Sequence, residues 1–173
     1  MKAADSRRER KRSGRASTGS AAAIVEGLRA ARQTLAVAES CTGGWLGREI
    51  TSVPGASACF WGGVIAYDDS AKLRLLSVAE DTLAVHGAVS ERTATEMAAG
   101  VAVLSGATWG VGITGVAGPG GGTADKPVGT VCVAIAGPRP RCMTWHLSGE
   151  REGIRREAVA RTLGVLEAAI EGG

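Results

Sequence analysis

Residues 34–47, TLAVAESCTGGWLG, join a short apolar run to a turn with two adjacent glycines. The run from Leu35 to Ala38 is typical of a buried strand, and a helical pattern follows over residues 43–52. In an open α/β sheet, functional sites form at the carboxyl ends of such strands. Four polar or reactive residues stand at this end: Glu39, Ser40, Cys41 and Thr42. A hydroxyl group in this place can cap the helix, attack a carbonyl or bind phosphate.

Strand and helix patterns alternate along the rest of the chain. Strands are expected at about residues 34–39, 60–67, 108–114, 128–136 and 141–148. Helices are expected at about residues 20–32, 43–52, 69–76, 77–87, 90–105 and 150–170. The link between the last two strands is short enough for a hairpin, so that pair should be antiparallel. The pattern predicts a three-layer α/β/α sandwich around a mixed, mostly parallel sheet of about five strands that ends in an antiparallel hairpin.

Composition and charge divide the chain into a tail and one domain. The 173 residues are 45% hydrophobic, which is enough for one core, and we expect a single domain over residues 20–173. Residues 1–19 have no apolar periodicity and are expected to form a disordered basic tail. Seven basic and two acidic residues lie in 1–18, whereas thirteen basic and fifteen acidic residues follow. This balance argues against a nucleic-acid-binding face on the domain and leaves nucleic-acid contact by the tail as an open alternative.

The sequence also bears on location and on metal binding. No run approaches the ~18 apolar residues of a membrane helix, and the arginines at 7–8 are not followed by an apolar segment. We therefore expect a cytoplasmic protein with reduced thiols and no membrane contact. The four cysteines have no CxxC spacing, and the two histidines match no metal-ligand pattern. Neither a metal nor a cofactor is expected.

Lysine is scarce outside the tail, where eleven arginines accompany only Lys72 and Lys126. Arginine cannot give up its proton, whereas a desolvated lysine can act as a general base. Lys72 follows Tyr67 by five residues, one turn into a helix that begins at a strand end, so its ammonium can reach back over the sheet edge. The alternative is a surface lysine on a short helix. Lys126 lies beside a proline in a loop and is interpreted as solvated.

A third strand ends in the glycine-rich segment TGVAGPGGGT at residues 114–123. Its backbone N–H groups can cradle a phosphate or contact a substrate. Because the segment lacks the Gly-Lys-Ser/Thr ending of a P-loop, ATP-type binding is not expected. The ends of the first three strands are expected to meet at one edge of the sheet.

Four sequence blocks together resemble the CinA C-terminal domain family, the family of nicotinamide-mononucleotide amidohydrolases. They are AESCTGG (38–44), GVIAYDDSAK (63–72), HGAVSE (86–91) and TGVAGPGGGTADKPVGTV (114–131). The blocks come in the family's order and spacing. The resemblance runs from about Gln33 to the final helix and leaves the tail outside. The chain is similar to the stand-alone deamidase form of the family.

The resemblance implies hydrolysis of the carboxamide of nicotinamide mononucleotide to nicotinic acid mononucleotide and ammonia, a pyridine-nucleotide salvage reaction. It also implies a homodimer. The family's serine, lysine and tyrosine fall on Ser40, Lys72 and Tyr67, which become the expected catalytic residues. A Ser–Lys pair can hydrolyse an amide without histidine or metal. The residues expected to bind substrate are Glu39, Thr42, Gly43, Gly44, Thr114, Gly115, Gly118 and Arg151.

Some points stay open at this level. Glu39 is expected to orient either the site or only the turn. Asp69 stands where the family often has asparagine, and it either adds charge near the substrate or holds Lys72 protonated. One alternative function is a non-catalytic nucleotide-binding or regulatory module linked to competence or DNA damage. Another is an amidohydrolase whose substrate lacks phosphate.

Overall fold

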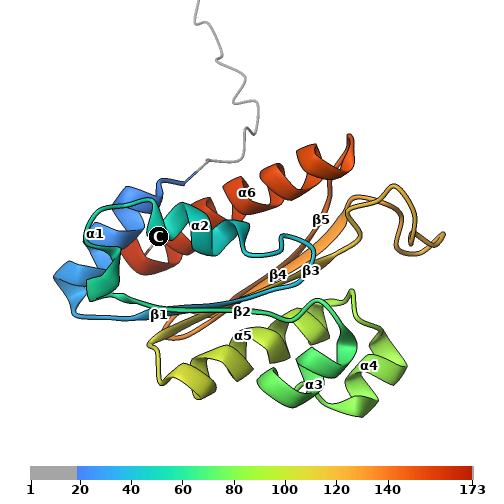
Figure 1. Cartoon of the computed structure of the whole chain (residues 1–173), viewed down its shortest axis with the longest axis horizontal. Coiled ribbons are helices and arrows are strands. Elements are labelled where there is room, and N and C mark those ends of the chain that lie inside the picture. The colour runs from blue at the N-terminus through green and yellow to red at the C-terminus, as the bar shows by residue number, and fades with distance from the viewer. Residues whose placement is uncertain (1–18, 173) are drawn as a thin grey trace, which may run out of the picture.

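The computed structural model describes residues 19–172 (Figure 1). The expected tail lies, up to residue 18, outside the described residues. The strands are β1 (Leu35–Glu39), β2 (Phe60–Ile65), β3 (Trp109–Gly115), β4 (Thr130–Ala136) and β5 (Arg141–His146). The helices are α1 (Ala21–Ala31), α2 (Trp45–Thr51), the 3-10 turn η1 (Ala56–Ala58), α3 (Asp69–Leu76), α4 (Glu80–His86), α5 (Glu91–Ser105) and α6 (Arg151–Glu171).

The five strands form one mixed sheet in the order β2-β1-β3-β4-β5. β1 pairs in parallel with β2 and β3, whereas β3–β4 and β4–β5 are antiparallel. Only β4 therefore runs against the other four strands. The predicted fold class is confirmed, including the terminal hairpin; the β3–β4 pair adds a second antiparallel ladder. In the register, Glu39 lies opposite both Ile65 and Ile113, so β1, β2 and β3 end at the same edge.

Helices cover both faces of the sheet. Figure 1 shows α1, α2 and α6 on one face and α3, α4 and α5 on the other. The larger core cluster fills the first side, with Leu28, Ile50 and Leu166 packed on strand residues such as Val37. On the second side α5 lies very close to β3, and a Cβ atom added at Gly112 would overlap the α5 backbone at Ala94. Small residues on this side hold the strand that leads to the candidate site against its helix.

Two element boundaries near the candidate site differ from expectation for local reasons. β2 ends at Ile65, because the Asp68 side chain accepts from Ser70 N–H at 2.9 Å and begins α3. Tyr67 therefore lies in a connection instead of a strand. α2 begins at Trp45 because Gly43 and Gly44 have φ values of 61° and 94°, which a helix cannot accommodate.

Within residues 19–172, no helix is long and apolar enough to cross a membrane.

Candidate active site

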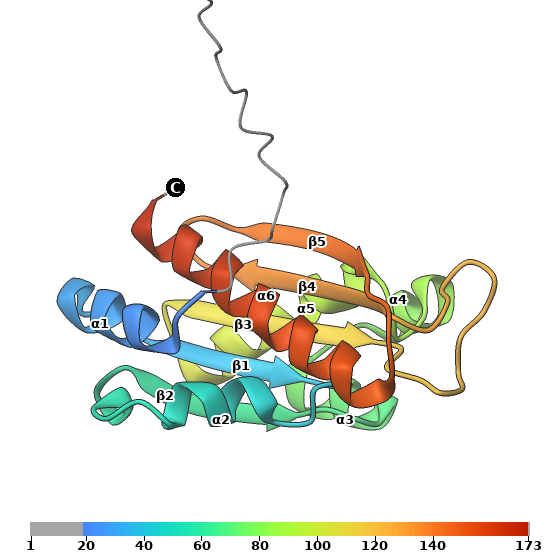
Figure 2. The same ribbon diagram turned by 90° about the horizontal axis from the view of Figure 1, so that it is seen from above.

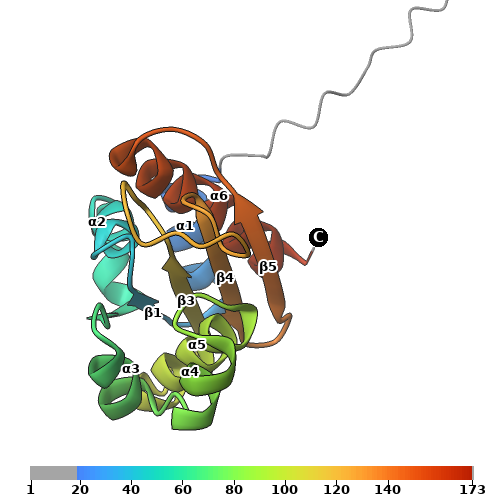
Figure 3. The same ribbon diagram turned by 90° about the vertical axis from the view of Figure 1, so that its right-hand side faces the viewer.

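Ser40 is the first residue after β1, at the edge where three strands end. Its backbone N–H donates to Ile113 O of β3 at 2.9 Å, which ties the residue to the neighbouring strand. Ser40 is 8% exposed. Within residues 19–172 its hydroxyl has no hydrogen-bond partner. Ser40 is thus a nearly buried hydroxyl that is not used as a helix cap. Figure 3 faces this edge of the sheet.

Glu39 holds the turn that follows Ser40. Its buried carboxylate accepts from the N–H groups of Gly44 and Leu46, both at 3.1 Å, and of Gly47 at 2.9 Å. At the start of a helix such donors are usually bound by the side chain of the N-cap residue. The N-cap residue of α2 is Gly44, which has no side chain, so Glu39 takes this role. Of the two expectations for Glu39, the structure supports the turn: the carboxylate is directed at the protein backbone.

The two glycines of the turn do not offer free amide groups. Gly43 N–H donates to Ser40 O at 3.1 Å, and Gly44 N–H is bound by Glu39. By contrast, no acceptor on another described residue receives the N–H of Cys41 or Thr42. Thr42 has no exposed surface, whereas Cys41 is 6% exposed. Of these two amides, the one next to Ser40 is that of Cys41.

Lys72 lies on α3 with its side chain 2% exposed, which rules out the surface-lysine alternative. Its Nζ donates to Tyr67 O at 3.2 Å and to Asp69 Oδ1 at 3.0 Å. Both acceptors suit an ammonium group. No hydrogen bond joins Lys72 Nζ to Ser40 Oγ among the described residues. The fold brings Lys72 to the edge where Ser40 lies but pairs it with Asp69.

Tyr67 and Arg151 meet across this edge. Arg151, the first residue of α6, donates from Nη2 to Tyr67 Oη at 3.0 Å and from Nη1 to Gly118 O at 2.7 Å. Tyr67 is 59% exposed, and its backbone carbonyl receives Lys72. One tyrosine thus connects the lysine to the arginine, and the arginine connects the β2–α3 connection to the glycine-rich loop.

Thr114, Gly115 and Gly118 carry the chain from β3 into that loop. Thr114 is buried, and its hydroxyl donates to Ala88 O at 2.7 Å, so it ties β3 to the segment before α5. Gly115 ends β3 opposite Val131. Beyond it, the N–H groups of Gly118 and of residues 120–122 have no acceptor within residues 19–172. The loop therefore offers backbone amides without acceptors in the described part of the chain, and its role as a cradle stays a prediction.

A pocket of about 530 Å³ adjoins this loop. It is lined by Ala117, Pro119, Val128, Gly149, Glu150 and Arg151. A smaller pocket of about 310 Å³ lies beside the Ser40 turn, against Gly43, Trp45 and Arg155 among others. Among residues 19–172, no three His, Cys, Asp or Glu side chains gather closely enough to hold a metal ion.

Comparison with known proteins identifies the family. The model of the CinA C-terminal domain matches residues 17–170 of the chain. The chain belongs to this family. The resemblance carried by the four sequence blocks is thereby confirmed.

Two relatives are the CinA-like proteins of Synechococcus elongatus and of Anaeromyxobacter sp. (strain K). The first is 51% identical over 142 residues, which cover 80% of this chain and 34% of the relative. The second is 47% identical over 148 residues, which cover 85% of this chain and 36% of the relative. This chain therefore spans about a third of the length of the curated relatives it matches.

Solved structures of the superfamily share the fold. A competence-damaged protein (CinA) superfamily protein of Klebsiella pneumoniae is 33% identical, with a TM-score of 0.84 over 88% of this chain and 96% of that one. The competence/damage inducible protein CihA of Agrobacterium tumefaciens is 36% identical, with a TM-score of 0.81 over 87% of this chain and 93% of that one. The α/β architecture of this CinA-family chain is therefore the one its relatives have.

The structure also shows contacts that sequence reasoning missed. Lys126, interpreted as solvated, donates from Nζ to His86 O at 2.5 Å, at the carboxyl end of α4. This hydrogen bond joins the glycine-rich loop to the end of α4. Arg155 donates from Nε to Cys41 O at 3.0 Å and from Nη2 to Thr42 O at 2.8 Å. A signal for Arg155 was present, because it follows Arg151 by four residues and so shares its helix face.

Cys41 is excluded as a nucleophile by its surroundings. Burial raises the pKa of its thiol to about 12, so the thiol stays protonated near neutral pH.

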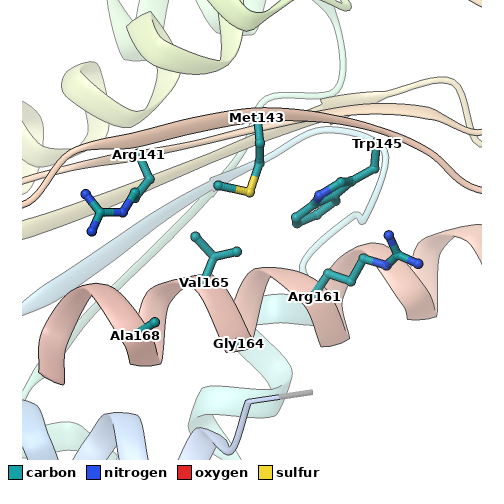
Figure 4. A pocket seen from close by; sticks show the side chains of 7 residues that line it. All are labelled: Arg141, Met143, Trp145, Arg161, Gly164, Val165 and Ala168. Carbon is teal, nitrogen blue, oxygen red and sulfur yellow. The ribbon is translucent and has the colours of Figure 1, made fainter. Parts of the chain in front are cut away.

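Another pocket, of about 360 Å³, lies between β5 and the second half of α6 (Figure 4). There the Arg161 guanidinium stacks over Trp145, 5.9 Å from the ring centroid. No expected site residue lines this pocket.

Proposed function

We propose that this CinA-family domain hydrolyses the carboxamide of nicotinamide mononucleotide, with Ser40 as nucleophile and Lys72 as general base. The observation that carries the proposal is the burial of Lys72 at the edge where the unpartnered Ser40 hydroxyl lies. Most arginines of the domain are at least partly exposed, whereas this lysine has almost no contact with water. A binding module gains nothing from a buried lysine at the same sheet edge as a free hydroxyl.

The reaction is a two-step acyl transfer. Neutral Lys72 takes the proton of Ser40 while Oγ attacks the carboxamide carbon, and an oxyanion forms. The Lys72 ammonium then protonates the amino group of the intermediate, the C–N bond breaks, and ammonia leaves. Water attacks the acyl-enzyme, again giving a proton to Lys72, and the Oγ–C bond breaks to release nicotinic acid mononucleotide. Lys72 returns that proton to Ser40, so atoms and protons balance over the cycle.

For the first step, Lys72 has to exchange Asp69 for Ser40 as its partner. The Asp69 side chain is 56% exposed, so water can solvate the carboxylate when the lysine leaves it. Tyr67 contributes its carbonyl as a fixed second acceptor for Nζ. A substrate carboxamide bound at this edge would give Lys72 another polar neighbour and favour the exchange.

The phosphate of the substrate is assigned to the glycine-rich loop and Arg151. The loop offers the unpaired N–H groups of Gly118 and of residues 120–122, and Arg151 stands at the mouth of the adjoining pocket. Guanidinium and clustered backbone amides are the usual partners of phosphate oxygens. An amidohydrolase whose substrate lacks phosphate would have less need of the Arg151 guanidinium and of these loop amides.

An ammonia-release assay tests the proposal. The compounds to compare are nicotinamide mononucleotide, nicotinamide riboside and nicotinamide. Release from the mononucleotide alone is expected, and Ser40→Ala should abolish it while titration calorimetry still detects binding. Equal turnover of the riboside would remove the phosphate assignment. Binding of the mononucleotide without any ammonia release by the wild-type chain would favour the regulatory module linked to competence or DNA damage.

A further inference from the structure

Arg155 reaches the Ser40 turn from a distant helix. It lies one turn beyond Arg151 on α6, and Figure 2 shows the first turns of α6 beside the carboxyl end of β1. Its Nε and Nη2 atoms bind two successive backbone carbonyls, those of Cys41 and Thr42. Its guanidinium also lies over the Trp45 ring, 5.5 Å from the centroid. A planar fork on two carbonyls fixes orientation as well as distance.

Nothing else among residues 19–172 holds these two carbonyls through a side chain. Glu39 holds the chain only from Gly44 onward. The hydroxyl of Thr42 is buried without a partner, so the turn is not fastened through that side chain. Gly43 leaves room for the guanidinium, because a Cβ there would lie 3.3 Å from Nη2. Thr42 O also accepts from Trp45 N–H at 3.3 Å, so among the described residues Cys41 O is the carbonyl that Arg155 alone holds.

The orientation of this turn decides where one amide group points. In a trans peptide the N–H points opposite to the C=O of the same unit. The Ser40–Cys41 unit is held by Gly43 N–H on Ser40 O, and the next unit is held by Arg155 on Cys41 O. Cys41 is thus held on both sides, and its N–H has no acceptor on another described residue. In strand-to-helix nucleophile turns, the amide after the nucleophile is a common oxyanion donor.

We propose that Arg155 is a positioning residue that locks the Ser40 turn so that the Cys41 N–H can stabilise the oxyanion formed at Ser40. This inference rests on the proposed function, because it requires Ser40 to act as a nucleophile. Arg155 itself does not touch the reacting atoms. Loss of one oxyanion donor lowers kcat by about 10²–10³, and loss of a residue that only orients the donor should cost about 10- to 100-fold.

The test uses Arg155→Met and Arg155→Lys, with Arg156→Met as the matched control. Arg156 is the next residue and is exposed. Two readouts are measured on the full chain. One is kcat and KM for ammonia release from nicotinamide mononucleotide. The other is the rate at which a fluorophosphonate probe labels Ser40, which forms an Oγ–P bond, expels fluoride and requires no knowledge of the substrate.

The expected result is a 10- to 100-fold fall in kcat and in labelling rate for Arg155→Met, with KM changed less than about three-fold. Arg155→Lys should recover part of the loss, because an ammonium can bind one carbonyl. Arg156→Met should match the wild type. Labelling of Arg155→Met at the wild-type rate overturns the inference, and so does a rise in KM at unchanged kcat. If Arg155→Met does not fold, Arg155→Lys decides by the same two criteria.

The outcomes separate this inference from the proposed function. A wild-type chain that neither releases ammonia nor reacts with the probe would remove both. A wild-type chain whose Ser40 is labelled, while Arg155→Met is labelled equally fast, would remove only the role of Arg155.

Discussion

Lys72 Nζ lies 3.0 Å from Asp69 Oδ1, and the two side chains differ sharply in exposure, 2% against 56%. The pair thus joins a buried amine to a carboxylate that water reaches. Because water can solvate the Asp69 carboxylate, the ion pair can open without leaving a carboxylate that is both buried and unpaired. In the proposed reaction Asp69 is the partner that Lys72 gives up, and Tyr67 O, at 3.2 Å, is the acceptor that it keeps.

Lys72→Arg and Lys72→Met should be about equally inactive, with kcat lowered by about 10²–10⁴. Arginine retains the charge but cannot accept a proton from Ser40. Ammonia release measures kcat, and calorimetric binding of the mononucleotide shows whether the site persists. Arg74→Met, an exposed change on the same helix, is the control. Activity of Lys72→Arg near the wild-type level would mean that the lysine acts only through its charge.

Asp69→Asn should raise kcat at neutral pH by roughly two- to ten-fold. The amide can keep the contact with Lys72 Nζ, yet it removes the negative charge that stabilises the ammonium form. The measurement is ammonia release at fixed pH and saturating substrate. The control is Asp81→Asn on α4. Asp68→Asn is not suitable as a control, because Asp68 caps α3. A fall in kcat would show that Asp69 serves the reaction directly.

Glu39→Ala should destabilise the fold by about 2–3 kcal/mol, because three N–H groups at the start of α2 lose their acceptor. For a domain of this size, Tm should fall by about 5–10 °C. Thermal unfolding followed by circular dichroism measures it. Glu49→Ala is the control, since that side chain interacts only with nearby residues on α2. A shift of less than about 1–2 °C would contradict the capping role.

Lys126→Met should raise KM by roughly three- to ten-fold with little change in kcat. The substitution releases the glycine-rich loop from His86 O while leaving the Arg151 contact to Gly118 in place. Steady-state kinetics with nicotinamide mononucleotide measure the change. Asp125→Asn alters the exposed neighbour in the same loop and should leave KM unchanged. An unaltered KM for Lys126→Met would separate the loop from substrate binding.

Cys41 should resist alkylation while the exposed Cys142 reacts. With a pKa of about 12, the Cys41 thiolate fraction at pH 8 is about one in ten thousand. Burial raises the pKa above the value of an unfolded thiol, so the folded state keeps a proton that the unfolded state releases. Stability from this group is therefore present below about pH 9 and falls as pH rises further.

Iodoacetamide labelling followed by peptide mass spectrometry checks that Cys41 resists alkylation. Unfolding midpoints between neutral and alkaline pH check that stability falls above about pH 9. Cys41→Ala is expected to make that fall smaller. Rapid modification of Cys41 in the native chain would contradict its burial.

Much of the fold could be predicted because the local signals agreed with one another. The alternation of strand and helix patterns and the short link between the last two strands both indicated the same sandwich. The signals failed where two local forces competed. At Tyr67 an apolar run continues, but the Asp68 cap ends the strand first.

For the candidate site, the sequence determined which side chains stand at the strand ends, because each lies in the last residues of its strand or within a few residues of its end. Ser40 after β1, Lys72 one turn into α3 and Thr114 in β3 could all be placed in this way. Tertiary structure alone decided how they are held. Glu39 turns toward α2, Lys72 pairs with Asp69, and Arg155 reaches the Ser40 turn from more than a hundred residues away. The physical reason is that a hydrogen bond depends on distance and angle in space, which only the packing of α6 and α3 on the sheet establishes.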